Sequence, residues 1–228
     1  MPALSDFKTR IAVIALLAIV VASSFGFWSY GEYKKREFHR AIVALATDAS
    51  VQLRGALSTD ASVAALEPPQ PLEDRADQID RELERLRRSG GARNPAQFDA
   101  IEMYVITARE LLRRQASAYR DAAELAKSRG ALRELMQQAG HRSPSWFGQA
   151  MRAKKQFETD AFNYRLAVDA IAKLLDSMPE PRAQLAPYVD PGLLLDEGLR
   201  AQALERARDA SKRTAEEVEQ VRRFVALR

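Results

Sequence analysis

The run Ile11–Gly31 constrains this chain more than any other feature, because it contains no charged residue and charged residues bound it on both sides. At a helical rise of about 1.5 Å per residue the run is about 31 Å long, which matches the hydrocarbon core of a bilayer. We therefore predict a short N-terminal tail over 1–10 and a single transmembrane anchor over 11–31. The lipid bilayer is then the first predicted partner.

The main alternative for this segment is a cleaved secretory signal peptide. Lys8 and Arg10 form a basic start, and Ala22 ends an acceptable small-residue cleavage site. The apolar core of a signal peptide is usually about 7–15 residues long, whereas apolar residues here continue past Ala22 to the aromatic side chains of Trp28 and Tyr30. We favour an uncleaved anchor whose far end carries interfacial aromatic residues.

Basic residues near the anchor give conflicting signals about its orientation. The positive-inside rule places the larger basic cluster, which follows the anchor, in the cytoplasm. Long C-terminal domains, however, translocate largely regardless of charge, so we expect a cytoplasmic N-terminus and an extracytoplasmic domain. Basic side chains at the interface attract anionic headgroups by about 1 kcal/mol each. The predicted membrane-interface residues are Trp28, Tyr30, Lys34, Lys35, Arg36 and Arg40.

Composition favours an all-α fold. The 228 residues include only 10 Gly and 10 Pro, and Ala, Leu, Arg and Glu fill the segments between them. No segment shows the alternation of polar and apolar residues that is typical of a strand. We predict an anchor helix that is continuous with an elongated antiparallel helical bundle with coiled-coil-like seams.

Proline and glycine mark the expected helix boundaries. Asn94-Pro95, Ser143-Pro144 and Asp190-Pro191 each place a capping residue before a proline at the first helical position. The expected elements are a juxtamembrane helix over 32–57 that is continuous with the anchor, a Pro-rich linker over 58–71, and a bundle over 72–228 with helices at about 72–88, 95–139, 144–178 and 191–227.

Apolar residues recur at three- and four-residue steps in these helices. The clearest seam runs from Phe147 to Met178, and Lys154 is its only charged position; its long apolar stem predicts an amino group that reaches solvent. The last helix has a thinner and more polar seam. Because few residues separate helices 95–139 and 144–178, we expect them to form an antiparallel hairpin.

The sequence contains no motif for catalysis or cofactor binding. The two histidines, His39 and His141, have no acidic partner at metal-ligand spacing, and the absence of cysteine excludes thiolate metal sites and disulfides. We therefore predict that the protein is not an enzyme and holds no cofactor or metal. The formal net charge of +4 comes from scattered arginine pairs beside acidic residues, so no nucleic-acid partner is expected.

Two apolar clusters are candidate contacts with a partner. Trp146 and Phe147 either close the end of the bundle or present a partner-binding knob. Leu193, Leu194 and Leu195 are more adjacent apolar residues than one helix face buries, so they form either a second packing layer or a contact with another chain.

These features favour a membrane-anchored, non-enzymatic helical scaffold, assembly factor or accessory subunit that contacts another protein or a second copy of itself. The alternative is an extracytoplasmic small-molecule-sensing bundle that works with a separate transducer. A helical-repeat array ranks last, because the predicted helices are too long for tetratricopeptide units of about 34 residues.

Overall fold

The computed structural model describes the backbone of residues 3–58, 70–91, 94–137 and 144–226, and the side chains of 30–58, 71–91, 94–137 and 145–223. The described residues are all-α, which confirms the predicted class, and they include no strand. The elements are α1 (Ala3–Ser58), α2 (Gln70–Gly90), α3 (Pro95–Gln137), α4 (Pro144–Ser177), α5 (Pro179–Leu185), the 3-10 turn η3 (Pro191–Leu193) and α6 (Glu197–Ala226).

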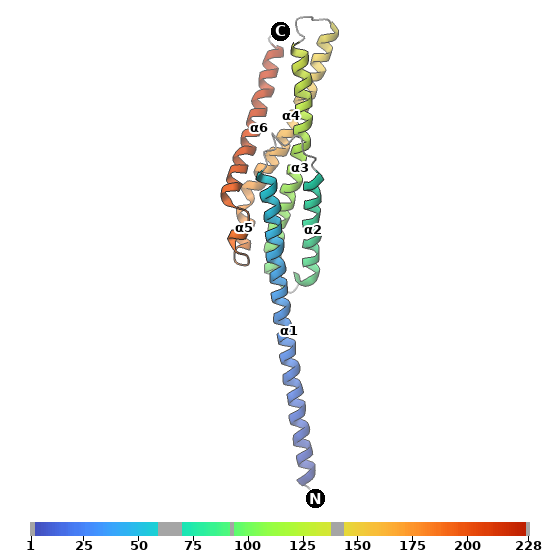
Figure 1. Ribbon diagram of the computed structural model, residues 1–228, viewed down its shortest axis with the longest axis vertical. Helices are drawn as coiled ribbons and strands as arrows, with labels where there is room; N and C mark the ends of the chain where they lie inside the picture. Colours follow the sequence, from blue (N-terminus) through green and yellow to red (C-terminus); the bar gives the residue numbers. More distant parts are fainter. Residues whose placement is uncertain (1–2, 59–69, 92–93, 138–143, 227–228) are drawn as a thin grey trace.

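Helix α1 projects far beyond the other helices and ends inside the bundle (Figure 1). Its backbone stays helical through Gly31, and Phe38 is the first of its described side chains to be buried. No helix with described side chains is both long enough and apolar enough to cross a membrane. The side chains of 11–29, which make up most of the predicted anchor, lie outside the described residues, as does most of the predicted Pro-rich linker.

Four long helices surround one core. Helix α1 packs against α3, α3 against α4, α4 against α6, and α6 against α1. Helix α2 lies outside this ring against α1 and α3, and α3 and α4 form the expected antiparallel hairpin (Figure 1). We call the part that contains α1 and α2 the base, and the part where α3, α4 and α6 continue beyond Ser58 the tip.

The predicted apolar seams form the core. Periodic positions that face the same side of a helix are buried together, because their neighbours on the other helices do the same. Buried seam residues include Ile42, Leu45, Ala46, Ala49, Leu53, Ala56 and Leu57 in α1; Ile101, Tyr104, Ala108, Leu111, Ala118, Leu125 and Leu132 in α3; Phe157, Ala161, Tyr164, Val168, Ile171 and Leu175 in α4; and Leu204, Ala207, Ser211, Thr214 and Val218 in α6.

A ladder of ion pairs joins α2 to α3. The carboxylates belong to α2 and the guanidinium groups to α3, and successive pairs step along the two antiparallel helices. Each pair is partly exposed and contributes at most about 1 kcal/mol, but together the pairs favour one register of α2 on α3. The pairs are Glu73 with Arg120 at 2.7 Å, Asp77 with Arg113 at 2.9 Å and Asp80 with Arg109 at 2.5 Å.

The predicted start of the last helix is wrong. Asp190 does act as a cap, but its carboxylate accepts from the Gly192 amide in the short turn η3, and the backbone becomes extended at Leu194. Helix α6 begins only at Glu197, where the carboxylate of Asp196 accepts from the Leu199 amide at 2.8 Å. A capping residue before proline therefore started one turn here rather than a helix.

Contacts with distant residues explain this interruption. One guanidinium nitrogen of Arg54 in α1 donates to the Leu194 carbonyl at 2.7 Å and to the Gly192 carbonyl at 3.3 Å. These carbonyls are therefore paired with a side chain from α1 instead of with amides of a continuing helix.

Candidate functional site

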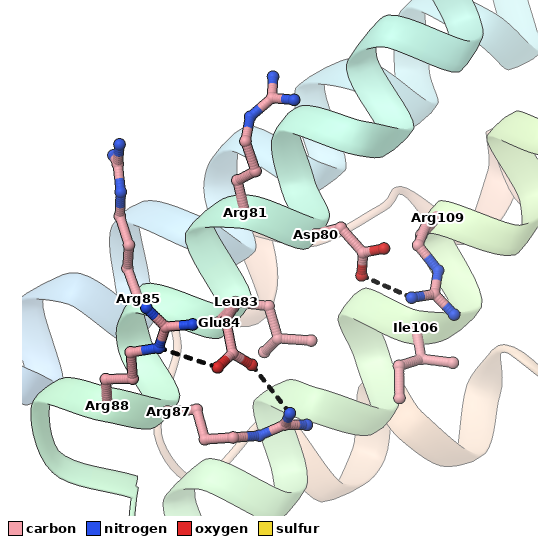
Figure 2. Close-up of a pocket in the computed structure, with 9 residues that line it drawn as sticks. All are labelled: Asp80, Arg81, Leu83, Glu84, Arg85, Arg87, Arg88, Ile106 and Arg109. Atoms are coloured by element: carbon pink, nitrogen blue, oxygen red, sulfur yellow. Dashed lines mark hydrogen bonds and ion pairs between the residues drawn. The ribbon is translucent and has the colours of Figure 1, made fainter.

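A groove of about 550 Å³ lies between the second half of α2 and the first half of α3 (Figure 2). We call it the arginine groove. Its lining combines guanidinium groups from both helices, two carboxylates and two branched apolar side chains. The lining residues are Asp80, Arg81, Leu83, Glu84, Arg85, Arg87, Arg88, Ile106 and Arg109.

The centre of the arginine groove is apolar. Leu83 from α2 and Ile106 from α3 lie between two polar clusters, and Ile106 remains 40% exposed while Leu83 is buried (Figure 2). On one side Arg109 binds Asp80, and on the other Glu84 accepts from a neighbouring arginine pair. The groove therefore presents a small apolar contact area between charged walls.

The charged walls are predominantly basic. Five arginines and two carboxylates line the groove, which gives a formal charge of +3 (5 − 2). Arg87 also binds Glu102, and this hydrogen bond, with the charge of Glu102, raises the pKa of Arg87 above its ordinary value. Arg81 forms no ion pair with a described residue, and Arg81 and Arg85 extend away from the groove floor (Figure 2).

A second polar site is buried in the base around Tyr104. Its hydroxyl shares a hydrogen bond of 2.8 Å with the Ser50 hydroxyl and accepts from the Leu195 amide at 3.0 Å. Burial raises the pKa of Tyr104, so the phenol stays neutral at physiological pH. Because Tyr104 has no exposed surface, we interpret this site as a structural connection between α1, α3 and the segment before α6.

The predicted membrane-interface residues that are described lie on the part of α1 that precedes the bundle. Tyr30 is exposed, and the Lys34 amino group lies 5.9 Å from its ring centroid and 2.8 Å from Glu37. The bond to Glu37 raises the pKa of Lys34. Lys35 pairs with Glu32 at 3.0 Å, so acidic neighbours offset two of the four positive charges.

The remaining predicted membrane-interface residues are Arg36, Arg40 and Trp28. Arg36 and Arg40 are exposed on α1. The side chain of Trp28 lies outside the described residues.

Trp146 and Phe147 have different environments. Trp146 is half-buried, and its indole nitrogen donates to the Leu135 carbonyl of α3 at 3.0 Å, which fits the closing of the bundle end. Phe147 is 60% exposed, so its predicted place in the α4 seam is wrong. The adjacent Trp146 turns toward α3 instead, which leaves Phe147 on the outer face.

The leucine cluster is mostly internal. Leu194 and Leu195 are each 1% exposed and belong to the core of this chain, which matches the second packing layer rather than a contact with another chain. Leu193 is 37% exposed and is the member that remains on the surface. Lys154 of the α4 seam is half-buried, and its amino group lies 3.9 Å from the Glu158 carboxylate.

Sequence reasoning missed two surfaces. The arginine groove escaped notice because α2 and α3 each supply only part of it, and Arg87–Arg88 alone resembles an ordinary solvated pair. The outer face of α4 also carries exposed Met151, Phe162 and Leu166. The four-residue step between Phe162 and Leu166 was a signal that these side chains share a face.

Comparisons with known proteins add no assignment. Among the described side chains, no group of three His, Asp or Glu residues is placed to hold a metal ion. No protein-family model, curated protein or solved structure matches this chain. The function is therefore argued from the sequence and the geometry of the chain alone.

Proposed function

We propose that this protein is a membrane-anchored, non-enzymatic helical scaffold, assembly factor or accessory subunit that acts by protein–protein contact. In this proposal residues 11–31 cross the bilayer once. The N-terminus is cytoplasmic and the bundle is extracytoplasmic.

The main support is the continuity of α1. One helix carries the uncharged run Ile11–Gly31 and then the buried stripe that starts at Phe38. About seven residues separate the end of this run from Phe38, a distance of about 10 Å along the helix. The base of the bundle would therefore stand close to the membrane surface, in a fixed relation to the anchor.

The exposed surfaces also favour contact with other proteins. Ile106 in the arginine groove and Phe162 and Leu166 on α4 are apolar side chains on a chain whose core is already filled by its own helices. Exposed apolar groups that lie together on helix faces are typical of interaction surfaces.

Membrane fractionation tests the anchor directly. The full chain is expected to remain in the membrane pellet after alkaline carbonate extraction, and a variant with Leu16→Lys, Ile19→Lys and Val20→Lys is expected to be released, since each charge at the centre of a span costs about 2.5–3.5 kcal/mol. The matched control places three lysines at the exposed neutral positions Gln149, Thr159 and Asn163 of α4. Extraction of the unmodified chain would contradict the proposal.

Protease treatment of intact spheroplasts tests the orientation. Digestion of the bundle before lysis is the expected result, with the mass of the protein reporting whether it is cleaved after Ala22. Protection until lysis would place the bundle in the cytoplasm and would overturn the proposed orientation, while leaving the scaffold role to be tested against cytosolic partners.

A further inference from the structure

We propose that the arginine groove is the docking site for an acidic, amphipathic helical segment of a partner protein. This inference rests on the proposed function, because it names the surface through which a scaffold of this kind would hold its partner. Arg81, Arg85 and Ile106 are the residues that we expect to contact the segment.

Charge complementarity identifies the partner as acidic. The lining has a formal charge of +3, which becomes +1 when Glu82 and Glu102, the carboxylates that pair with it from beside the groove, are included, and Arg81 has no ion pair with a described residue. Arg85 has one carboxylate neighbour, Glu82 at 2.6 Å, and 74% of its side chain is exposed. The Arg81 guanidinium is therefore available to a carboxylate of another chain, and the exposed Arg85 can exchange Glu82 for one. Guanidinium binds carboxylate in a directional, two-point geometry.

The floor of the groove identifies the partner as a polypeptide. The carboxylates of the lining, Asp80 and Glu84, are already paired with its arginines, so the apolar floor is the feature that distinguishes a polypeptide from a phosphate ligand. Ile106 is 40% exposed between these charged pairs and lies beside Leu83, so an apolar side chain inserted there would be removed from water (Figure 2). A segment with both acidic and apolar side chains satisfies both features.

The dimensions of the groove fit a short helix. The α2 side of the lining runs from Asp80 to Arg88, which corresponds to about 12 Å or two helical turns. On a helix of this length, acidic side chains one turn apart would meet Arg81 and Arg85, because these two are themselves one turn apart. An apolar side chain on the adjacent face would meet Ile106.

Site-specific photo-crosslinking of the full chain in its native membranes tests the proposal. A benzophenone amino acid replaces Ile106 in the groove, and a matched control carries it at Leu166 on the outer face of α4. Mass spectrometry then identifies the crosslinked segment. The expected product at position 106 is a segment that contains several Asp or Glu residues and apolar residues at helical spacing.

Charge variants make the result specific. The double variant Arg81→Glu with Arg85→Glu is expected to reduce the yield of the crosslink at position 106 by about tenfold. The double variant Arg81→Lys with Arg85→Lys should retain most of the yield, because charge attraction is expected to contribute most of the binding free energy. The control crosslink at position 166 should not change in either variant. Replacing the acidic residues of the identified segment with lysine should restore crosslinking to the Glu variant.

Several results would overturn the proposal. They are a product at position 106 that is lipid, nucleic acid, a second copy of this chain or a segment without acidic residues, and a yield that charge reversal leaves unchanged. If protein partners crosslink at Leu166 but not at Ile106, this inference fails and the scaffold function stands. If neither position yields a protein, both fail.

Discussion

The base and the tip of the bundle share three long helices but differ in how many helices surround their cores. Large apolar side chains such as Ile42, Leu53 and Leu112 fill the base, where α1 and α2 add two further layers around α3. In the tip these three helices meet without α1 and α2, and their core combines large apolar side chains such as Phe157 with buried polar ones such as Thr214. Because burial of apolar area is the main stabilising term in folding, most of the stability is expected in the base.

Charged contacts also join the helices of the tip. Arg129 of α3 binds Glu217 of α6 with two bonds of 2.7 Å, and Arg222 binds Glu158 at 2.9 Å. These pairs are partly exposed, so water and salt weaken them. Ion pairs also join α2 to α3 in the base, so the two parts differ in the number of helices packed around the core rather than in whether charged contacts hold them.

The largest expected effect comes from Leu53→Ala in the base. Leu53 is fully buried, so its truncation should lower the free energy of unfolding by about 2–5 kcal/mol. Urea unfolding of the purified full chain in mild detergent, followed by circular dichroism, measures this change. The neighbouring Val51 is 53% exposed, so Val51→Ala is the control and should change stability by about 0.5 kcal/mol or less. Equal effects would contradict the packing of α1.

Tyr104→Phe tests the polar connection within the base. Removing the hydroxyl leaves the Leu195 amide and the Ser50 hydroxyl without this partner, which should cost about 1–3 kcal/mol. Arg54 and the rest of the core stay in place, so the variant should remain folded. Tyr33 is exposed, so Tyr33→Phe is the matched control and should change the free energy of unfolding very little.

The same variant has a predicted pH signature. Burial, opposed by the bonds to Ser50 and Leu195, raises the folded-state pKa of Tyr104. The contribution of the neutral Tyr104 phenol to the free energy of unfolding is therefore fully present below the unfolded-state pKa of about 10. It is lost as the pH rises through the higher folded-state pKa. Stability of the unmodified chain should fall more steeply above this pH than that of Tyr104→Phe. Identical slopes would show that Tyr104 does not titrate with unfolding.

Two glycine substitutions compare the packing of the two parts. A methyl group on Gly90 in the base would lie 2.7 Å from the Phe38 ring, so Gly90→Ala should destabilise the protein by about 1 kcal/mol or more. Gly130 in the tip has open space around it, and Gly130→Ala should stabilise the helix by about 0.5–1 kcal/mol. Unfolding midpoints measured side by side test both signs. A change of the same sign at both positions would contradict the comparison.

The smallest expected effect comes from Glu217→Gln in the tip. Both Arg129 and Glu217 are about one-third exposed, so loss of the pair should cost about 0.2–1 kcal/mol at low salt and less at high salt. A double-mutant cycle with Arg129→Gln at two salt concentrations isolates the pair from other effects. A coupling free energy that does not depend on salt would show that the tip is not held electrostatically.

Local patterns predicted most of the helices and seams. Apolar residues at three- and four-residue steps were predicted to be buried, and Ile42, Leu53, Leu111 and Phe157 are, because residues on one face of a helix pack against the same neighbouring helices. Phe147 broke the pattern because it lies in the first turn of α4, where Trp146 makes the contact with α3. Near a helix end, fewer neighbours are available to decide which side faces inward.

The candidate site was less predictable. The arginines of the arginine groove come from two helices, and the sequence does not state that Arg109 lies beside Asp80, twenty-nine positions earlier. The same limitation applies to Leu194 and Leu195, whose burial depends on the path of the chain between α5 and α6.

Several features have local causes and follow from the amino-acid order: the α-helical class, the uncharged run Ile11–Gly31, and the starts of α3 and α4 at Pro95 and Pro144. Caps, prolines and apolar periodicity depend on residues only a few positions apart, so they can be recognised directly in the sequence. The start of α6 and the position of the arginine groove depend instead on contacts between distant parts of the chain. The Leu195 amide donates a hydrogen bond to the hydroxyl of Tyr104, 91 positions earlier, and no local sequence pattern indicates a contact between residues so far apart.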